Sequence, residues 1–132
     1  SEVWSVTSYG ELRSKGLEAE RHTRLNPQDP QTPHAFKCFG DETPTVATSD
    51  HISSVPEMIQ RWVGGRYIVL GTDGFGRSDT RDALRSFFEI DTNSIVVATL
   101  SALEQDGSMP AGTVEKASIA KNISLDRHDK TA

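Results

Sequence analysis

Residues 67–81 read Tyr67-Ile68-Val69-Leu70-Gly71-Thr72-Asp73-Gly74-Phe75-Gly76-Arg77-Ser78-Asp79-Thr80-Arg81. A short apolar run leads into a glycine-rich turn, and a stretch with helical character begins near Thr80. A strand, a turn and a helix start in this order are typical of α/β proteins, and such a turn presents backbone N–H groups to an anion. The segment therefore predicts an α/β fold and marks one candidate binding loop.

Further segments continue the alternation between extended and helical patterns. Ser8 precedes Glu11 by the capping-box spacing, which predicts a helix start. Three prolines within residues 26–33 exclude a regular element there. The expected elements are, in order, a strand at Val3–Thr7, a helix at about Tyr9–Leu25, a short helix or strand at His34–Phe39, a strand at Pro44–Ser49, a helix from Ser53 or Ser54 to Val63 with Val55, Met58, Ile59 and Trp62 as its apolar stripe, a strand at Tyr67–Leu70, a helix that buries Ala83, Leu84, Phe87 and Phe88, a helix from Asp91 to Gly107, and a helix near Thr113–Asn122.

This order predicts a three-layer α/β fold with a mostly parallel sheet. We expect one domain over residues 1–123, followed by a polar tail at 124–132. Three strands are few for the helices that surround them. Either a strand is missed by the pattern, or the chain is a piece of a larger protein.

Composition excludes several classes of function. The net charge of −5, with 14 scattered Lys and Arg, argues against non-specific binding to nucleic acid. No apolar run approaches the roughly 20 residues of a membrane-spanning helix, so no membrane association is expected. The single cysteine, Cys38, allows no intramolecular disulfide, and the cytoplasm is the default location.

The glycine turn on its own is a weak phosphate site. Its spacing is G-x-x-G-x-G rather than the dinucleotide fingerprint, and no Gly-Lys-Ser/Thr follows. Two aspartates in the turn oppose an anion, although two arginines offset them. A tight turn with Ser78 or Asp79 as helix cap is the simpler interpretation. The alternative is a free-standing α/β module that binds a phosphorylated ligand at Gly71–Asp79, with Gly74, Gly76, Arg77 and Ser78 as the candidate anion-binding residues.

Other reactive side chains give no stronger signal. The four histidines lack metal-ligand spacing, so a zinc site is not indicated. Asp50 and His51 are adjacent, and we expect them in the loop after a strand, at the carboxyl edge of the sheet. Cys38 lies in an apolar context without a neighbouring histidine in sequence, which favours a buried, inert thiol. Trp4 and Trp62 are expected to pack in a core or an interface.

A family resemblance adds to this interpretation. It rests on five blocks and two further ones that follow in order, and it covers nearly the whole chain, fading after about Gly107. The blocks resemble the carboxyl-terminal region of the homodimeric bacterial pyruvate dehydrogenases, thiamine-dependent enzymes of the transketolase superfamily. They are Val3–Tyr9, Gly16–Arg21, Leu25–Pro27, Ala47–Asp50 and Leu70–Arg81, continued by Phe88–Asp91 and Ile95–Ala98.

The resemblance implies a parent enzyme that decarboxylates pyruvate with thiamine diphosphate and Mg²⁺. Such enzymes pass the acetyl group to the lipoyl group of the dihydrolipoyl acetyltransferase component of their complex. In the family, the glutamate that activates the cofactor and the metal-binding Gly-Asp-Gly…Asn-Asn segment lie upstream. Thr72-Asp73-Gly74 occurs here, but no Asn-Asn follows at the required distance. No catalytic, cofactor-binding or metal-binding residue is therefore carried over to this chain.

The resemblance also implies an incomplete domain with a structural role. In relatives the carboxyl-terminal domain opens with a strand and a helix before Val3–Thr7, and this chain begins after both. We expect a transketolase carboxyl-terminal-like domain that lacks its first strand and helix and leaves part of its sheet or core uncovered. It would serve packing and dimer contacts in the homodimeric parent, bind no cofactor itself, and be inactive in isolation. A purely structural module without a ligand is the remaining interpretation.

Overall fold

The computed structural model describes residues 1–73, 84 and 88–121. Its elements are α1 (Tyr9–Leu25), α2 (His34–Phe39), β1 (Thr45–Thr48), α3 (Ser54–Glu57), the 3₁₀ turn η1 (Gln60–Trp62), β2 (Tyr67–Leu70), α5 (Thr92–Gln105) and α6 (Thr113–Ala120). In the described part of the chain, no helix is both long and apolar enough to cross a membrane.

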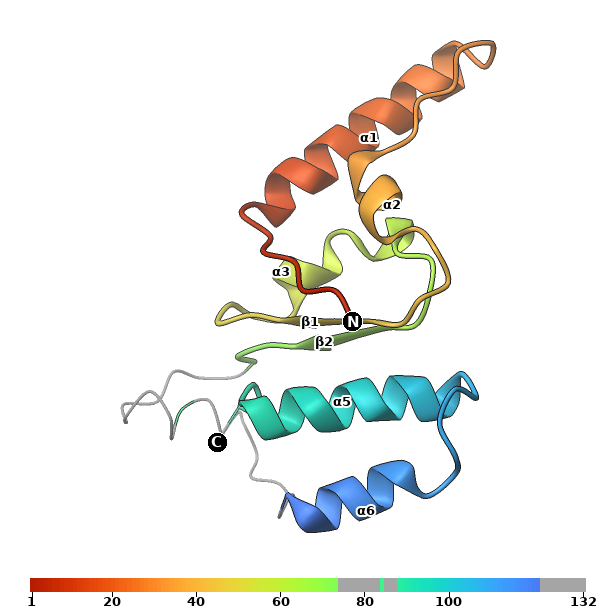
Figure 1. Ribbon diagram of the computed structural model, residues 1–132. Helices are drawn as coiled ribbons and strands as arrows, with labels where there is room; N and C mark the ends of the chain where they lie inside the picture. The colour runs from red at the N-terminus through yellow and green to blue at the C-terminus, as the bar shows by residue number, and fades with distance from the viewer. Residues whose placement is uncertain (74–83, 85–87, 122–132) are drawn as a thin grey trace.

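Two parallel strands form the centre of the fold. Thr45 pairs with Tyr67 and Thr48 with Leu70 in a parallel register, in agreement with the expected parallel sheet. Figure 1 shows α1, α2 and α3 on one side of the strands and α5 on the other, with α6 beyond α5. The layered α/β arrangement predicted from the sequence is therefore present.

Helix α1 begins and ends where its sequence predicts. The Oγ of Ser8 accepts a hydrogen bond from the Glu11 N–H at 3.0 Å, which satisfies one of the unpaired donors of the first turn. At the other end, the Asn26 N–H donates to the His22 carbonyl at 2.8 Å. Residues 26–33 then return along the helix without regular structure, as the prolines require.

The expected strand at Val3–Thr7 is wrong: residues 3–7 are in no strand. Val3 is 98% exposed, and Trp4 is 53% exposed with its ring edge-on to Phe39, 5.2 Å between centroids. A β-branched run forms a strand only where another strand supplies backbone hydrogen bonds. Nothing in the described part of the chain pairs with this segment.

The expected helix from Ser53 or Ser54 to Val63 is interrupted. Helix α3 ends at Glu57, Ile59 leaves helical geometry with φ −104° and ψ 6°, and η1 follows. Ile59 and Trp62 are 2% and 5% exposed. Packing of these two side chains overrides the helical pattern of the segment, because local propensity is weaker than tertiary contact.

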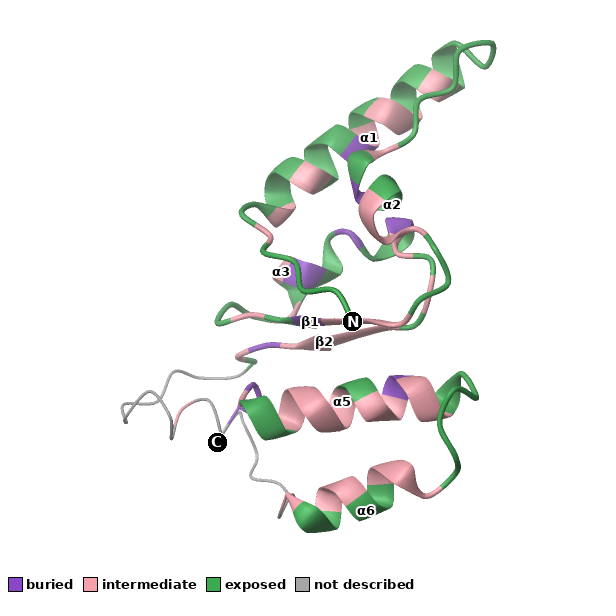
Figure 2. Cartoon of the chain, viewed as in Figure 1, coloured by how far each residue is buried: buried purple, intermediate pink, exposed green. Residues whose placement is uncertain are grey.

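The main core lies between α1, α2 and η1. Its buried members are Ala35, Ile59 and Trp62, and partly buried apolar side chains, including Tyr9 and Leu12 of α1, pack around them. Figure 2 shows how sparse the buried positions are along the chain. Gly16 lies directly against the Trp62 ring, where any Cβ would overlap it, so this glycine is required by close packing rather than by backbone conformation.

Helices α5 and α6 form the other side of the sheet. The Asp91 carboxylate caps α5 by accepting from the Ser94 N–H at 3.0 Å, as predicted. The last helix also forms, from Thr113 to Ala120. Of the expected helix that buries Ala83, Leu84, Phe87 and Phe88, most lies outside the described residues, although Phe88 itself is 6% exposed.

Candidate functional site

The carboxyl edge of the two strands is the candidate site. Because β1 and β2 are parallel, both end at this edge, and residues 49–53 and 71–73 follow them side by side. The Ser49 N–H donates to the Leu70 carbonyl at 3.0 Å, and the Thr72 N–H donates to the His51 carbonyl at 2.9 Å. The Thr72 hydroxyl adds a bond of 2.7 Å to the Asp50 carbonyl. These bonds hold the two loops to each other.

A carboxylate completes the connection between the loops. Asp73 Oδ1 accepts from the Ser53 N–H at 2.8 Å, and Asp73 Oδ2 accepts from the Ser53 hydroxyl at 2.6 Å. We call this pair of bonds the Ser53–Asp73 clasp. The sequence predicted Ser53 or Ser54 as a side-chain cap of α3, and this is wrong for Ser53, which precedes α3 without a capping side-chain bond. Its hydroxyl serves the clasp instead.

Gly71 makes the close approach of the loops possible. A Cβ at this position would lie 2.7 Å from both the backbone nitrogen and the Oγ of Ser53, and 2.9 Å from the His51 carbonyl oxygen. Two of these atoms belong to the backbone and cannot move aside cheaply. The first glycine of the glycine-rich turn is therefore explained by loop packing.

A cavity of about 550 Å³ opens beside this edge. It lies between the carboxyl end of β1 and the first turn of α5, where backbone N–H groups would favour an anion. Its lining offers hydroxyl, amide and carboxylate groups but no Lys, Arg or His among the described residues. The lining residues are Thr48, Ser49, Asp50, Ile90, Asp91, Thr92, Asn93 and Ile95.

The electrostatics of this cavity do not favour a phosphate. The Asp91 carboxylate already occupies the N-terminus of α5 through its bond to the Ser94 N–H, and Asp50 adds a second acidic side chain to the lining. Hydroxyl and amide groups remain available for neutral or cationic hydrogen-bonding groups. The described lining is thus built for polar contact without a charge that would select an anion.

The predicted anion-binding residues Gly74, Gly76, Arg77 and Ser78 lie outside the described residues. Binding of a phosphorylated ligand at Gly71–Asp79 therefore stays a prediction. His51 is exposed and lies in the loop at the carboxyl edge. Its backbone N–H donates to the Ser49 hydroxyl at 3.0 Å. This agrees with the expectation that Asp50 and His51 are loop residues there.

Cys38 differs from its expected environment. It is half-buried rather than buried, and its Sγ lies 3.6 Å from Nε2 of His34, one turn earlier on α2. His34 and Cys38 are four residues apart, and this spacing places two side chains on one face of a helix. That spacing is the sequence signal for this contact, although no histidine is an immediate neighbour of Cys38. Trp62 packs in the core, one of the two expected positions, and Trp4 is 53% exposed, so its packing in an interface stays a prediction.

Mg²⁺ finds no cluster of candidate ligands among the described residues of this domain. No group of three or more His, Cys, Asp or Glu in the described part could hold a metal ion. Thr72-Asp73 resembles the start of a metal-binding segment in sequence, yet both oxygens of Asp73 are bonded to Ser53.

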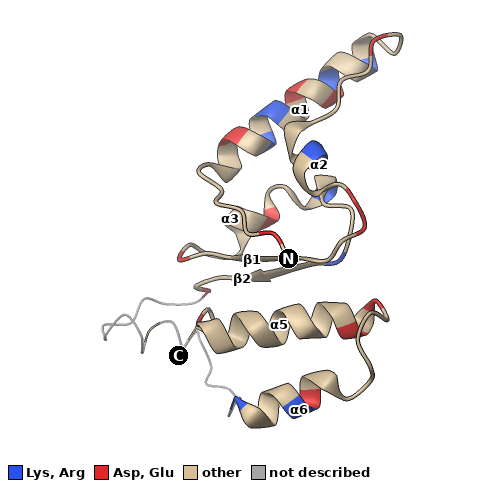
Figure 3. Ribbon diagram, in the orientation of Figure 1, with Lys and Arg blue, Asp and Glu red and all other residues tan. Residues whose placement is uncertain are grey.

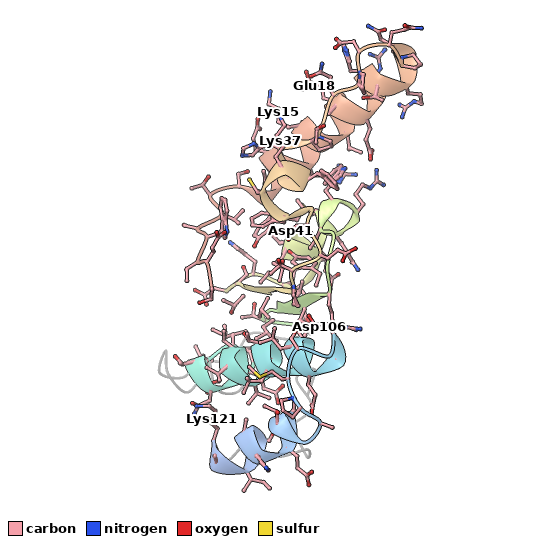
Figure 4. The ribbon with its side chains drawn as sticks, turned by 45° about the vertical axis from the view of Figure 1, so that its right-hand side comes forward. Lys15, Glu18, Lys37, Asp41, Asp106 and Lys121 are labelled. Atoms are coloured by element: carbon pink, nitrogen blue, oxygen red, sulfur yellow. The ribbon has the colours of Figure 1, made fainter. Side chains whose placement is uncertain are left out.

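The shifted pKa values lie at the opposite edge of the sheet. Burial raises the pKa of Tyr67 well above its usual value, with smaller contributions from Tyr9 and Glu57. The Tyr67 hydroxyl donates to the Pro56 carbonyl at 2.8 Å. Hydrogen bonds from Ser108 lower the pKa of Asp106, which follows α5. Figure 4 shows Asp106 beside the end of α5.

Helix α1 has charged side chains of both signs. Figure 3 shows Lys and Arg interspersed with Asp and Glu along α1. One pair, Lys15 and Glu18, lies 3.8 Å apart on this helix, and both side chains are more than half exposed. Such exposed pairs contribute little to stability. Charges of both signs therefore alternate along this helix.

Comparison with known proteins identifies the class. Residues 1–91 match the family described as the transketolase-like TK C-terminal domain, and the chain belongs to this family. The proteins that it resembles are named pyruvate dehydrogenase E1 component. The chain is 46% identical over 119 residues to that of Mycolicibacterium smegmatis, which covers 89% of this chain and 13% of the relative.

Two further relatives have the same name. The protein from Pseudomonas aeruginosa is 45% identical over 124 residues, or 92% of this chain and 14% of the relative. The protein from Escherichia coli K12 is 40% identical over 129 residues, or 96% of this chain and 14% of the relative. The chain therefore spans about one-seventh of the length of these relatives, and it corresponds to their carboxyl-terminal part.

Proposed function

We propose that this domain belongs to a thiamine-diphosphate-dependent pyruvate dehydrogenase and that it serves packing and dimer contacts rather than chemistry. The parent enzyme oxidatively decarboxylates pyruvate and transfers the acetyl group to a lipoyl group. The identity of 38–46% to proteins named pyruvate dehydrogenase E1 component supports this parent. The cofactor and Mg²⁺ belong to other domains of the parent, and the isolated chain is inactive.

The observation that carries the packing role is the open edge of β1. The Thr45 and Ser49 N–H groups donate to the Arg66 and Leu70 carbonyls at 2.8 and 3.0 Å, so these residues face β2. In a parallel ladder alternate residues face alternate sides, which leaves the backbone groups of Val46 and Thr48 on the other edge. In the described part of the chain, no strand pairs with that edge.

An open edge of this kind is costly in an isolated domain. Parallel strands are normally covered on both faces and extended on both sides by further strands. Two strands alone are marginally stable. The edge therefore supports a role in which another part of the parent enzyme supplies the missing strand.

Exposed apolar side chains near the amino terminus support the same role. Val3, Trp4 and Phe36 are 98%, 53% and 48% exposed. We call these three residues the amino-terminal apolar group. Trp4 reaches α2 through its contact with Phe39, so the group is attached to the folded domain rather than to a free end. Complete burial of an exposed apolar side chain stabilises by roughly 1.5–3 kcal/mol. Val3 could gain an amount in this range against the parent, and Trp4 and Phe36, already about half covered, would gain less.

The parent is proposed to be a cytoplasmic homodimer that works with a dihydrolipoyl acetyltransferase component. That component is expected to contact regions outside this chain. Under this proposal, changes in the amino-terminal apolar group alter assembly and stability of the parent. The chemistry of each assembled dimer stays unchanged, because no reacting group comes from this domain.

The test uses the full-length parent enzyme with Trp4→Asp. We expect a weaker dimer or a lower melting temperature, measured by sedimentation velocity and calorimetry, with kcat per assembled dimer kept within twofold. The matched control is Leu25→Asp, since Leu25 is 65% exposed at the far end of α1. A Trp4→Asp enzyme that assembles normally but loses kcat would overturn the proposal. Decarboxylation of pyruvate by this chain alone, with thiamine diphosphate and Mg²⁺, would overturn it as well.

A further inference from the structure

We draw no further inference here: the strongest candidate, the cavity between the carboxyl end of β1 and the first turn of α5, belongs to the site already described, and nothing in the described residues shows what occupies it.

Discussion

The Ser53–Asp73 clasp makes the most quantitative prediction. One carboxylate accepts two hydrogen bonds, of 2.8 and 2.6 Å, from a residue twenty positions earlier in the chain. A hydrogen bond to a charged group contributes about 1.5–3 kcal/mol. Asp73 is exposed, which places the values at the lower end of this range. Ser53→Ala removes one bond and is expected to cost about 1.5 kcal/mol of unfolding free energy, and Asp73→Ala, which removes both, about 2–3 kcal/mol.

The assay is urea unfolding of this chain with the two single variants and the double variant. Because Ser53→Ala deletes only the hydroxyl bond, the coupling energy of the cycle should be about 1–1.5 kcal/mol, within the range measured for residues in contact. Ser54→Ala is the matched control. Ser54 is exposed at the neighbouring position, and Ser54→Ala should alter the free energy of unfolding by no more than about 0.5 kcal/mol. A coupling energy near zero would show that the clasp does not hold the loops together.

Further predictions concern packing, titration and capping. Gly16→Ala places a methyl group against the Trp62 ring and should destabilise the chain by about 1–3 kcal/mol in thermal unfolding. The control is Gly10→Ala, whose Cβ has room, and this change should be neutral or stabilising by up to about 1 kcal/mol. Equal effects of the two substitutions would refute the packing argument. Because the pKa of Tyr67 is raised in the folded state, its contribution to stability is complete below the usual pKa of about 10 and is lost as the pH rises above it. Unfolding free energy should therefore fall above pH 10, and Tyr67→Phe should flatten that fall; an unchanged slope would contradict it. Asp91→Ala removes the cap of α5, so it should lower the free energy of unfolding by about 1 kcal/mol and reduce the helicity measured by circular dichroism. A loss of unfolding free energy below about 0.3 kcal/mol would count against the cap.

Local signals predicted the elements whose causes are local. Helix α1 follows from the Ser8 cap and the prolines after it, and the start of α5 follows from Asp91. The parallel pairing of β1 with β2 follows from alternation of strands and helices. The caps of the two helices depend on residues close together in sequence, and the parallel pairing follows from the order of the elements rather than from any single contact.

Elements that depend on distant partners were predicted less well. Val3–Thr7 has strand composition but no strand to pair with in the described residues. The helix expected up to Val63 is broken because Ile59 and Trp62 pack in the core.

The candidate site shows the same limit. The order of the elements correctly predicts that Asp50 and His51 lie at the carboxyl edge of the sheet. From the sequence, Asp73 is only a charge that opposes an anion in the glycine turn. Its bonds to Ser53 are not predicted, because Ser53 lies twenty residues away. An acidic residue three positions after a parallel strand, opposite a serine in the loop after the neighbouring strand, is the signal that would have indicated it.

Hydrogen exchange at the open edge of β1 tests most directly whether the parent enzyme covers that edge. Single-amide exchange is measured for Val46 and Thr48 in this chain and in the full-length parent enzyme, with Ser49, whose N–H is bonded to Leu70, as the protected reference. We expect rapid exchange at Val46 and Thr48 in this chain and strong protection in the parent, where another strand would cover them. Equally rapid exchange in both proteins would contradict the claim that this domain completes its sheet by packing against the rest of the enzyme.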